Sequence, residues 1–142
     1  MTSAAPTCPT RTDGVTTADV SSIDPFDLPE WLGTSEVTWV AQSTVRGAAH
    51  IRGELAGNGE AIACDLLAAD LAYPEPLLTD TWRRQAHQSW AYGQVLFVEY
   101  DGRLTLAVPG TAYSADGVLE TVSRLAKAVG VRPEHFTVTL RL

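Results

Sequence analysis

The sequence has little positive charge and no long apolar run. Ten Lys and Arg residues stand against seventeen Asp and Glu residues, which leaves a formal net charge of −7. Broad contact with nucleic acid needs clustered cations that displace counterions from phosphates, so this composition argues against a nucleic-acid partner. No segment reaches the ~20 apolar residues that span a bilayer, and the N-terminal stretch lacks the apolar region of a secretory signal. We therefore expect a cytoplasmic protein with no membrane partner.

Cysteine is also scarce. Cys8 lies in a Ser/Thr/Pro-rich stretch and Cys64 in an apolar strand-like segment, so a structural disulfide between them is not expected. The three histidines, His50, His87 and His135, have no short spacing to Cys, Asp or another His that would indicate a metal site. The sequence predicts no metal.

Motifs for cofactors and nucleophiles are missing as well. The segment GELAGNGEA is rich in glycine, but it lies between two predicted strands and lacks the Gly-Lys-Ser/Thr ending of a phosphate loop. No Gly-x-Ser-x-Gly elbow occurs, and the apolar context of Cys64 is typical of a small buried hydrophobe. The spacing of Asp65 and Asp70 sends them to opposite faces of a regular strand, which argues against an acid/base pair. We expect no cofactor and no catalytic residues.

A chain of 142 residues fits one domain preceded by a tail. Residues 1–25 contain few large apolar side chains and are expected to form a flexible acidic tail. Residues 26–142 are expected to form a single α+β domain. In DPFDLPEWLG, Pro29 and Gly33 predict one short helical turn. Four large apolar side chains in this segment are expected to pack it against the core: Phe26, Leu28, Trp31 and Leu32.

Two hairpins are well determined. Asn58-Gly59 predicts a type I′ turn that sets Leu55 opposite Ile62 and, further along, Arg52 opposite Asp65. Asp101-Gly102 predicts a second such turn, with Phe97 facing Leu106. With a strand in SEVTWVAQ and a half-buried strand in FTVTLRL, the sheet has about six strands.

Two longer helices complete the fold. One is expected from Thr79 or Asp80 to Gly93, the other from Ser114 or Asp116 to Gly130. The element order βββαββαβ indicates the α+β class, with a mainly antiparallel sheet and both helices packed on one face.

The first of these helices, TDTWRRQAHQSW at its start, carries the candidate contact residues. At about 100° per residue, Trp82, Ala86 and Trp90 share one buried stripe. Arg83 and His87 lie on its flank, where partner recognition often uses Arg and aromatic side chains. Two adjacent guanidiniums are the densest positive charge in an acidic chain, and the apolar loop AYPEPLLTD lies next to them. The predicted contact residues are Tyr73, Arg83, Arg84, His87 and Trp90.

Recognition is the simplest function for such a chain. We expect a non-catalytic domain that binds another protein or itself, the latter as a homodimer, through a sheet edge or the flank of this helix. The alternative is an enzyme or small-ligand carrier whose pocket between sheet and helices uses Arg83, His87, Tyr92 or Glu99. A third hypothesis is an escort for another polypeptide, which requires a stable dimer with an apolar groove.

Overall fold

Two tight turns organise the chain as the sequence predicts. The computed structural model describes residues 20–70 and 78–142. Asn58 and Gly59 have φ angles of 52° and 76°, and Asp101 and Gly102 have 58° and 74°, as type I′ turns require. Leu55 pairs with Ile62 and Phe97 with Leu106, so the register of both hairpins is confirmed.

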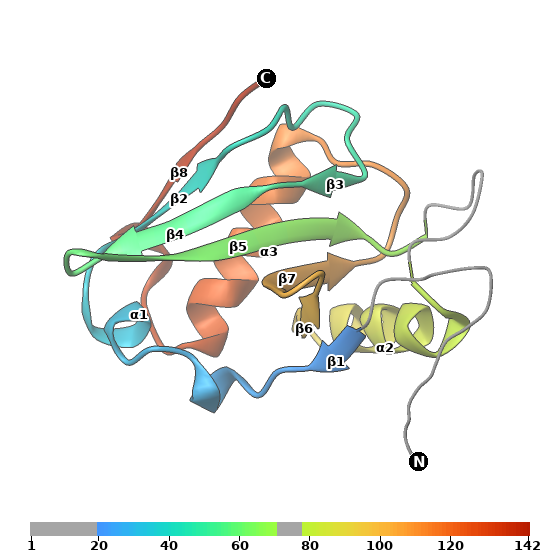
Figure 1. Ribbon diagram of the computed structural model, residues 1–142, viewed down its shortest axis with the longest axis horizontal. Coiled ribbons are helices and arrows are strands. Elements are labelled where there is room, and N and C mark those ends of the chain that lie inside the picture. The colour runs from blue at the N-terminus through green and yellow to red at the C-terminus, as the bar shows by residue number, and fades with distance from the viewer. Residues whose placement is uncertain (1–19, 71–77) are drawn as a thin grey trace, which may run out of the picture.

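In the described part of the chain, the sheet around these hairpins has eight strands and is mixed but mostly antiparallel (Figure 1). Its strands are β1 (Val20–Ser22), β2 (Val37–Ala41), β3 (His50–Ile51), β4 (Gly53–Gly57), β5 (Glu60–Ala68), β6 (Leu96–Tyr100), β7 (Arg103–Val108) and β8 (Phe136–Thr139). They lie in the order β1-β6-β7-β5-β4-β2-β8, with β3 beside β5. The pairs β5–β7 and β2–β8 are parallel and the others antiparallel. The α+β class is confirmed, with eight strands in place of about six.

The helical elements begin and end at residues suited to those positions. They are η1 (Pro25–Asp27), α1 (Trp31–Thr34), α2 (Asp80–Ala91), α3 (Ala115–Ala128) and η2 (Pro133–His135). The hydroxyl of Ser114 accepts a hydrogen bond from the N–H of Gly117 at 3.1 Å and caps α3, and Thr79 caps α2 in the same way. Gly93 and Gly130 follow the two helices with positive φ angles.

The two long helices pack on opposite faces of the sheet, so the expectation that both lie on one face is wrong. Val118, Val122 and Leu125 of α3 belong to a buried cluster with Leu66, Phe97 and Leu106. The cluster on the opposite face contains Trp82 and Ala86 of α2. Its strand residues are those that directly follow the three strand residues just named: Leu67, Val98 and Ala107. The central strands are apolar on both faces and do not alternate, so each face needs its own cover.

The first described residues depart from the tail expected over residues 1–25. Val20–Ser22 form β1 on the edge of β6, with Val20 opposite Tyr100, while residues 1–19 lie outside the described residues. Only Val20 of these three is partly buried, so the strand has almost no apolar pattern that sequence reasoning could detect.

Phe26 does not anchor the N-terminal turn, contrary to expectation. Its side chain is 95% exposed, whereas Trp31 and Leu32 are buried in the core. The carboxylate of Asp24 accepts a hydrogen bond from the N–H of Phe26 at 2.9 Å and starts the short η1 helix. The turn is therefore fixed by its cap and by the residues after it, which leaves Phe26 projecting outward.

Candidate functional site

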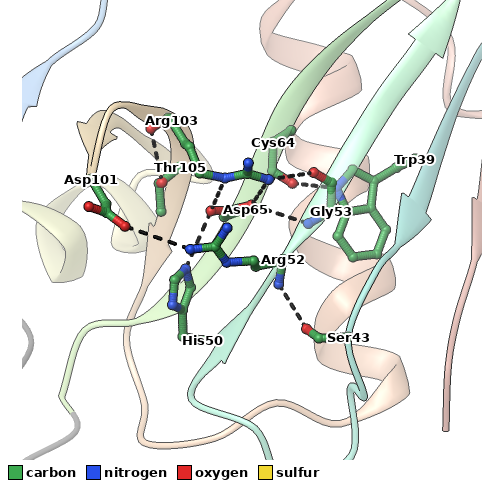
Figure 2. Close-up of polar contacts among 10 residues, drawn as sticks. All are labelled: Trp39, Ser43, His50, Arg52, Gly53, Cys64, Asp65, Asp101, Arg103 and Thr105. Atoms are coloured by element: carbon green, nitrogen blue, oxygen red, sulfur yellow. Dashed lines mark hydrogen bonds and ion pairs between the residues drawn. The ribbon is translucent and has the colours of Figure 1, made fainter.

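A buried carboxylate lies at the centre of the face that carries α2. Figure 2 shows Asp65 of β5 with Arg103 of β7 and Gly53 of β4 around it. The Arg103 guanidinium donates to both oxygens of Asp65, at 2.8 and 2.9 Å, and the N–H of Gly53 donates at 3.1 Å. The Asp65 side chain is fully buried and Arg103 is 24% exposed. This polar centre ties three strands together.

The donors around Asp65 hold it in the charged form. Burial alone would raise its pKa, but contacts from His50, Arg103 and the Gly53 N–H outweigh it and lower the pKa to about 2. The hydrogen bonds to Asp65 in turn raise the pKa of Arg103. A carboxylate whose lone pairs are already engaged is a weak general base, so the polar centre fits a structural role.

The ion pair predicted between Arg52 and Asp65 is replaced by another. Arg52 is half exposed and lies 3.7 Å from Asp101, while Arg103 takes its place at Asp65 (Figure 2). Thr105 is the register partner of Asp65 across the parallel β5–β7 pair, which puts Arg103, two residues earlier, on the same face. A non-local pairing thus overrides the hairpin partner.

Cys64 has the role that its sequence context indicates. It is buried on the face opposite Asp65, and burial raises the pKa of its thiol far above the ordinary value. Its carbonyl accepts a hydrogen bond from the indole N–H of Trp39 at 2.9 Å, and that indole packs against Gly53, where a Cβ atom would collide with it. Cys64 is part of the core.

Three of the predicted contact residues do come together. Arg83, Arg84 and His87 line a shallow hollow of about 500 Å³ whose remaining lining residues are Asp70, Asp80 and Gln88. Arg83 pairs with Asp80, and Nε2 of His87 lies 2.7 Å from Asp70. These carboxylates compensate most of the positive charge that the sequence indicates. Within the chain that the structure describes, Arg84 alone of the three has no ion pair.

The other two predicted contact residues are not in this hollow. Tyr73 lies outside the described residues. Trp90 lies under the guanidinium of Arg124 from α3, with 3.4 Å between Cζ and the ring centroid. Glu99, named for the alternative pocket, accepts from the hydroxyl of Ser21 on the sheet edge at 3.4 Å. The polar groups considered for catalysis therefore do not converge on one cavity.

Arg124 organises a surface that sequence reasoning missed. Its guanidinium donates to the carbonyls of Trp90 and Gln94, at 2.8 and 3.0 Å, and to Glu120 at 2.9 Å. It therefore fastens the end of α2 to α3. The sequence signal was limited to a Glu120 four residues before an arginine, an ordinary helix pair.

Beside Arg124 runs a groove with two exposed aromatic side chains, which we call the aromatic groove. Phe26 is 95% exposed and Tyr92 is 74% exposed. They share a cavity of about 390 Å³ with further residues from three segments: Pro25, Gly93, Gln94, Arg124, Lys127 and Ala128. A second hollow of about 390 Å³ continues it along α3 and shares Gly93, Arg124 and Lys127. Residues far apart in the sequence thus form one surface.

Comparisons with protein-family models, curated proteins and solved structures find no significant match for this chain. Residues 20–70 and 78–142 contain no group of three or more His, Cys, Asp or Glu side chains arranged to hold a metal ion. None of the helices in this part of the chain has the length and apolar character needed to cross a lipid bilayer.

Proposed function

We propose that this chain is a non-catalytic, cytoplasmic protein-interaction domain that binds a segment of another protein in the aromatic groove. The exposure of Phe26 and Tyr92 on one cavity is the observation that carries this proposal. Exposure of the two aromatic rings to water is unfavourable, and a partner that covers both rings stabilises the complex. Aromatic residues and arginine are also enriched among the side chains that dominate binding energy at protein interfaces.

The charge of the groove favours an acidic segment. The whole chain has a net charge of −7, yet Lys127 and Arg124 lie together in the groove lining. Arg124 is engaged by Glu120, whereas Lys127 is exposed and has no ion pair among the described residues. The partner segment that fits best therefore carries an apolar or aromatic side chain for the two rings and a nearby carboxylate for Lys127.

The groove is also well supported for binding. Arg124 fixes the end of α2 against α3 through its two carbonyl contacts, so Tyr92 and Lys127 are held on connected elements. A surface that is already in place before binding loses less conformational entropy when a partner arrives. This support favours a specific docking surface over two unrelated exposed side chains.

Selection of peptides by the purified chain from a random displayed library tests the proposal. We expect enriched peptides to combine an aromatic or large aliphatic residue with a neighbouring Asp or Glu. Phe26→Ala or Tyr92→Ala should weaken the binding of such a peptide about tenfold or more, measured by fluorescence anisotropy. Lys127→Glu should weaken the binding of acidic peptides and reduce the dependence of that binding on salt concentration.

Leu119→Ala is the matched control, because Leu119 is 47% exposed on α3 but does not line the groove. It should bind peptide like the wild type. Equal affinity of the Phe26→Ala and Leu119→Ala proteins would refute the proposal, as would a selection that enriches no peptide.

One observation supports a small-molecule ligand as the second candidate. The cavity of about 390 Å³ falls within the range of roughly 300 to 1,000 Å³ that is typical of small-molecule sites. Native mass spectrometry of the protein from its own host distinguishes the two. A stoichiometric small adduct that disappears in the Tyr92→Ala protein would favour this candidate over a peptide.

A further inference from the structure

Among the strands of residues 20–70 and 78–142, β8 is the outermost and has a neighbour on one side only. It pairs in parallel with β2, and Figure 1 shows it at the edge of the sheet next to the C-terminus. The strand is four residues long, Phe136–Thr139. After it, the carbonyl of Arg141 accepts a hydrogen bond from the N–H of Val45 at 2.7 Å, which holds the following residues against the same side of the sheet.

This edge lacks the usual protection against pairing. Residues 136–140, FTVTL, contain no charge and no proline and consist of strand-favouring side chains. The described part of the opposite edge, β1, is three residues long and contains two serines. Proteins commonly shield exposed edges with charge, proline or short strands. Within residues 20–70 and 78–142, β1 is a short edge strand of this kind, whereas β8 has neither charge nor proline.

The side chains of this edge divide by face in a way that suits extension of the sheet. Phe136, Val138 and Leu140 are half-buried and pack against the α3 cluster. Thr137 and Thr139 point to the other face and are exposed. A strand added here would cover the apolar rim on one face and contact the threonines on the other.

We propose that the added strand is β8 of a second copy of the chain, paired antiparallel about a twofold axis through Val138. This register sets Phe136 opposite Leu140 and Thr137 opposite Thr139, each pair occurring twice. An axis perpendicular to the sheet keeps equivalent faces on the same side, so the apolar rims of the two copies meet each other.

The lack of charge in the paired segment favours a second copy. Residues 136–140 contain no charged side chain. Glu134 lies outside the strand, in η2, at 4.0 Å from Arg132 of its own chain. The paired segments therefore set no carboxylates against each other, although the chain as a whole is acidic.

A pair of double variants tests the dimer and its register. Thr137→Lys with Thr139→Lys sets introduced lysines against each other across the axis and should raise the dimer dissociation constant about tenfold or more. Thr137→Lys with Thr139→Glu sets each introduced lysine opposite an introduced glutamate and should restore association to the wild-type level or above. Sedimentation velocity over a concentration series measures both.

These variants carry the same number of changes at the same exposed positions, so a common loss of folding would lower the thermal stability of both. A wild-type chain that stays monomeric at high concentration would overturn the proposal. So would a dimer that responds equally to the two double variants, because its interface would then lie elsewhere. Phe26→Ala should leave the dimer intact, which keeps this test separate from that of the aromatic groove.

Discussion

Asp65 decides the electrostatics of the sheet interior. Its side chain is fully buried, and the strong donors around it keep its pKa at about 2, below the ordinary value of 3.8. A carboxyl group with a lowered pKa stabilises the folded state when it is ionised and loses that contribution when it is protonated. The stabilisation by Asp65 is therefore fully present above about pH 4 and is lost as the pH falls towards 2.

Asp65→Asn should lower the free energy of unfolding by about 3 kcal/mol at neutral pH, the lower end for breaking a buried pair, because Arg103 can still reach water. Urea denaturation from pH 7 down to pH 2.5 measures the effect, and the difference from the wild type should shrink at the acidic end. Asp101→Asn is the control, since its pair with Arg52 is exposed, and it should cost less than about 1 kcal/mol. An equal loss in both variants would contradict the role assigned to Asp65.

Individual side chains were predicted well where the local sequence decides their environment. Cys64 is buried as its apolar neighbours indicate, and Trp82 lies on the inner side of its helix. Phe26 could not be predicted, because a large apolar residue in a short turn packs inward unless a specific cap turns it outward. The contact of His87 with a carboxylate could not be predicted either, because its partner Asp70 lies seventeen residues away in the sequence.

At the scale of elements, Arg124 couples the two long helices. It stacks on Trp90 and donates to carbonyls at the end of α2, although the helices cover opposite faces of the sheet. Carbonyls at a helix end lack partners within the helix, and a cation there satisfies them and interacts favourably with the helix dipole.

Arg124→Met keeps an apolar stem over Trp90 but removes every donor. We expect a loss of about 2 kcal/mol in the free energy of unfolding, as for hydrogen bonds from a charged group. Amide hydrogen exchange at Gly93 and Gln94 should be faster in the variant than in the wild type, whereas exchange in the two hairpins should stay the same. Arg132→Met, at a residue whose side chain is 78% exposed, should change neither quantity, and a uniform effect over the whole chain would argue against local coupling.

Elements defined by local signals were predictable, whereas their non-local partners were not. The turns at Asn58-Gly59 and Asp101-Gly102 determine two hairpins and their registers. The parallel pairing of β2 with β8 and the pairing of β1 with β6 join segments that are far apart in the chain. No turn residue specifies such pairs, so they follow from packing of the whole sheet.

At the scale of the molecule, two apolar clusters share one sheet. Leu66 and Leu67 are neighbours in β5, both fully buried, and they face the α3 cluster and the α2 cluster respectively. The positions of the helices could not be predicted from helix patterns alone. The apolar residues on both faces of β5, β6 and β7 were the signal that each face would be covered.

Leu66→Ala and Leu67→Ala therefore form a matched pair. Each should lower the free energy of unfolding by about 2 to 5 kcal/mol, and each protein should still unfold in a single transition because the strand is common to both clusters. Circular dichroism and tryptophan fluorescence followed together report this. A separate early melting of α2 in the Leu67→Ala protein alone would show that the clusters are independent units.

The parallel pairing of β2 with β8 also has a consequence for synthesis on the ribosome. Roughly 95 residues separate the two strands, so β2 is translated about 5 to 20 seconds before its neighbour. During that interval β2, which carries Trp39, has a free side that nascent chains on the same message could reach. We expect the free side of β2 to be covered once Phe136–Thr139 have been released and pair with it.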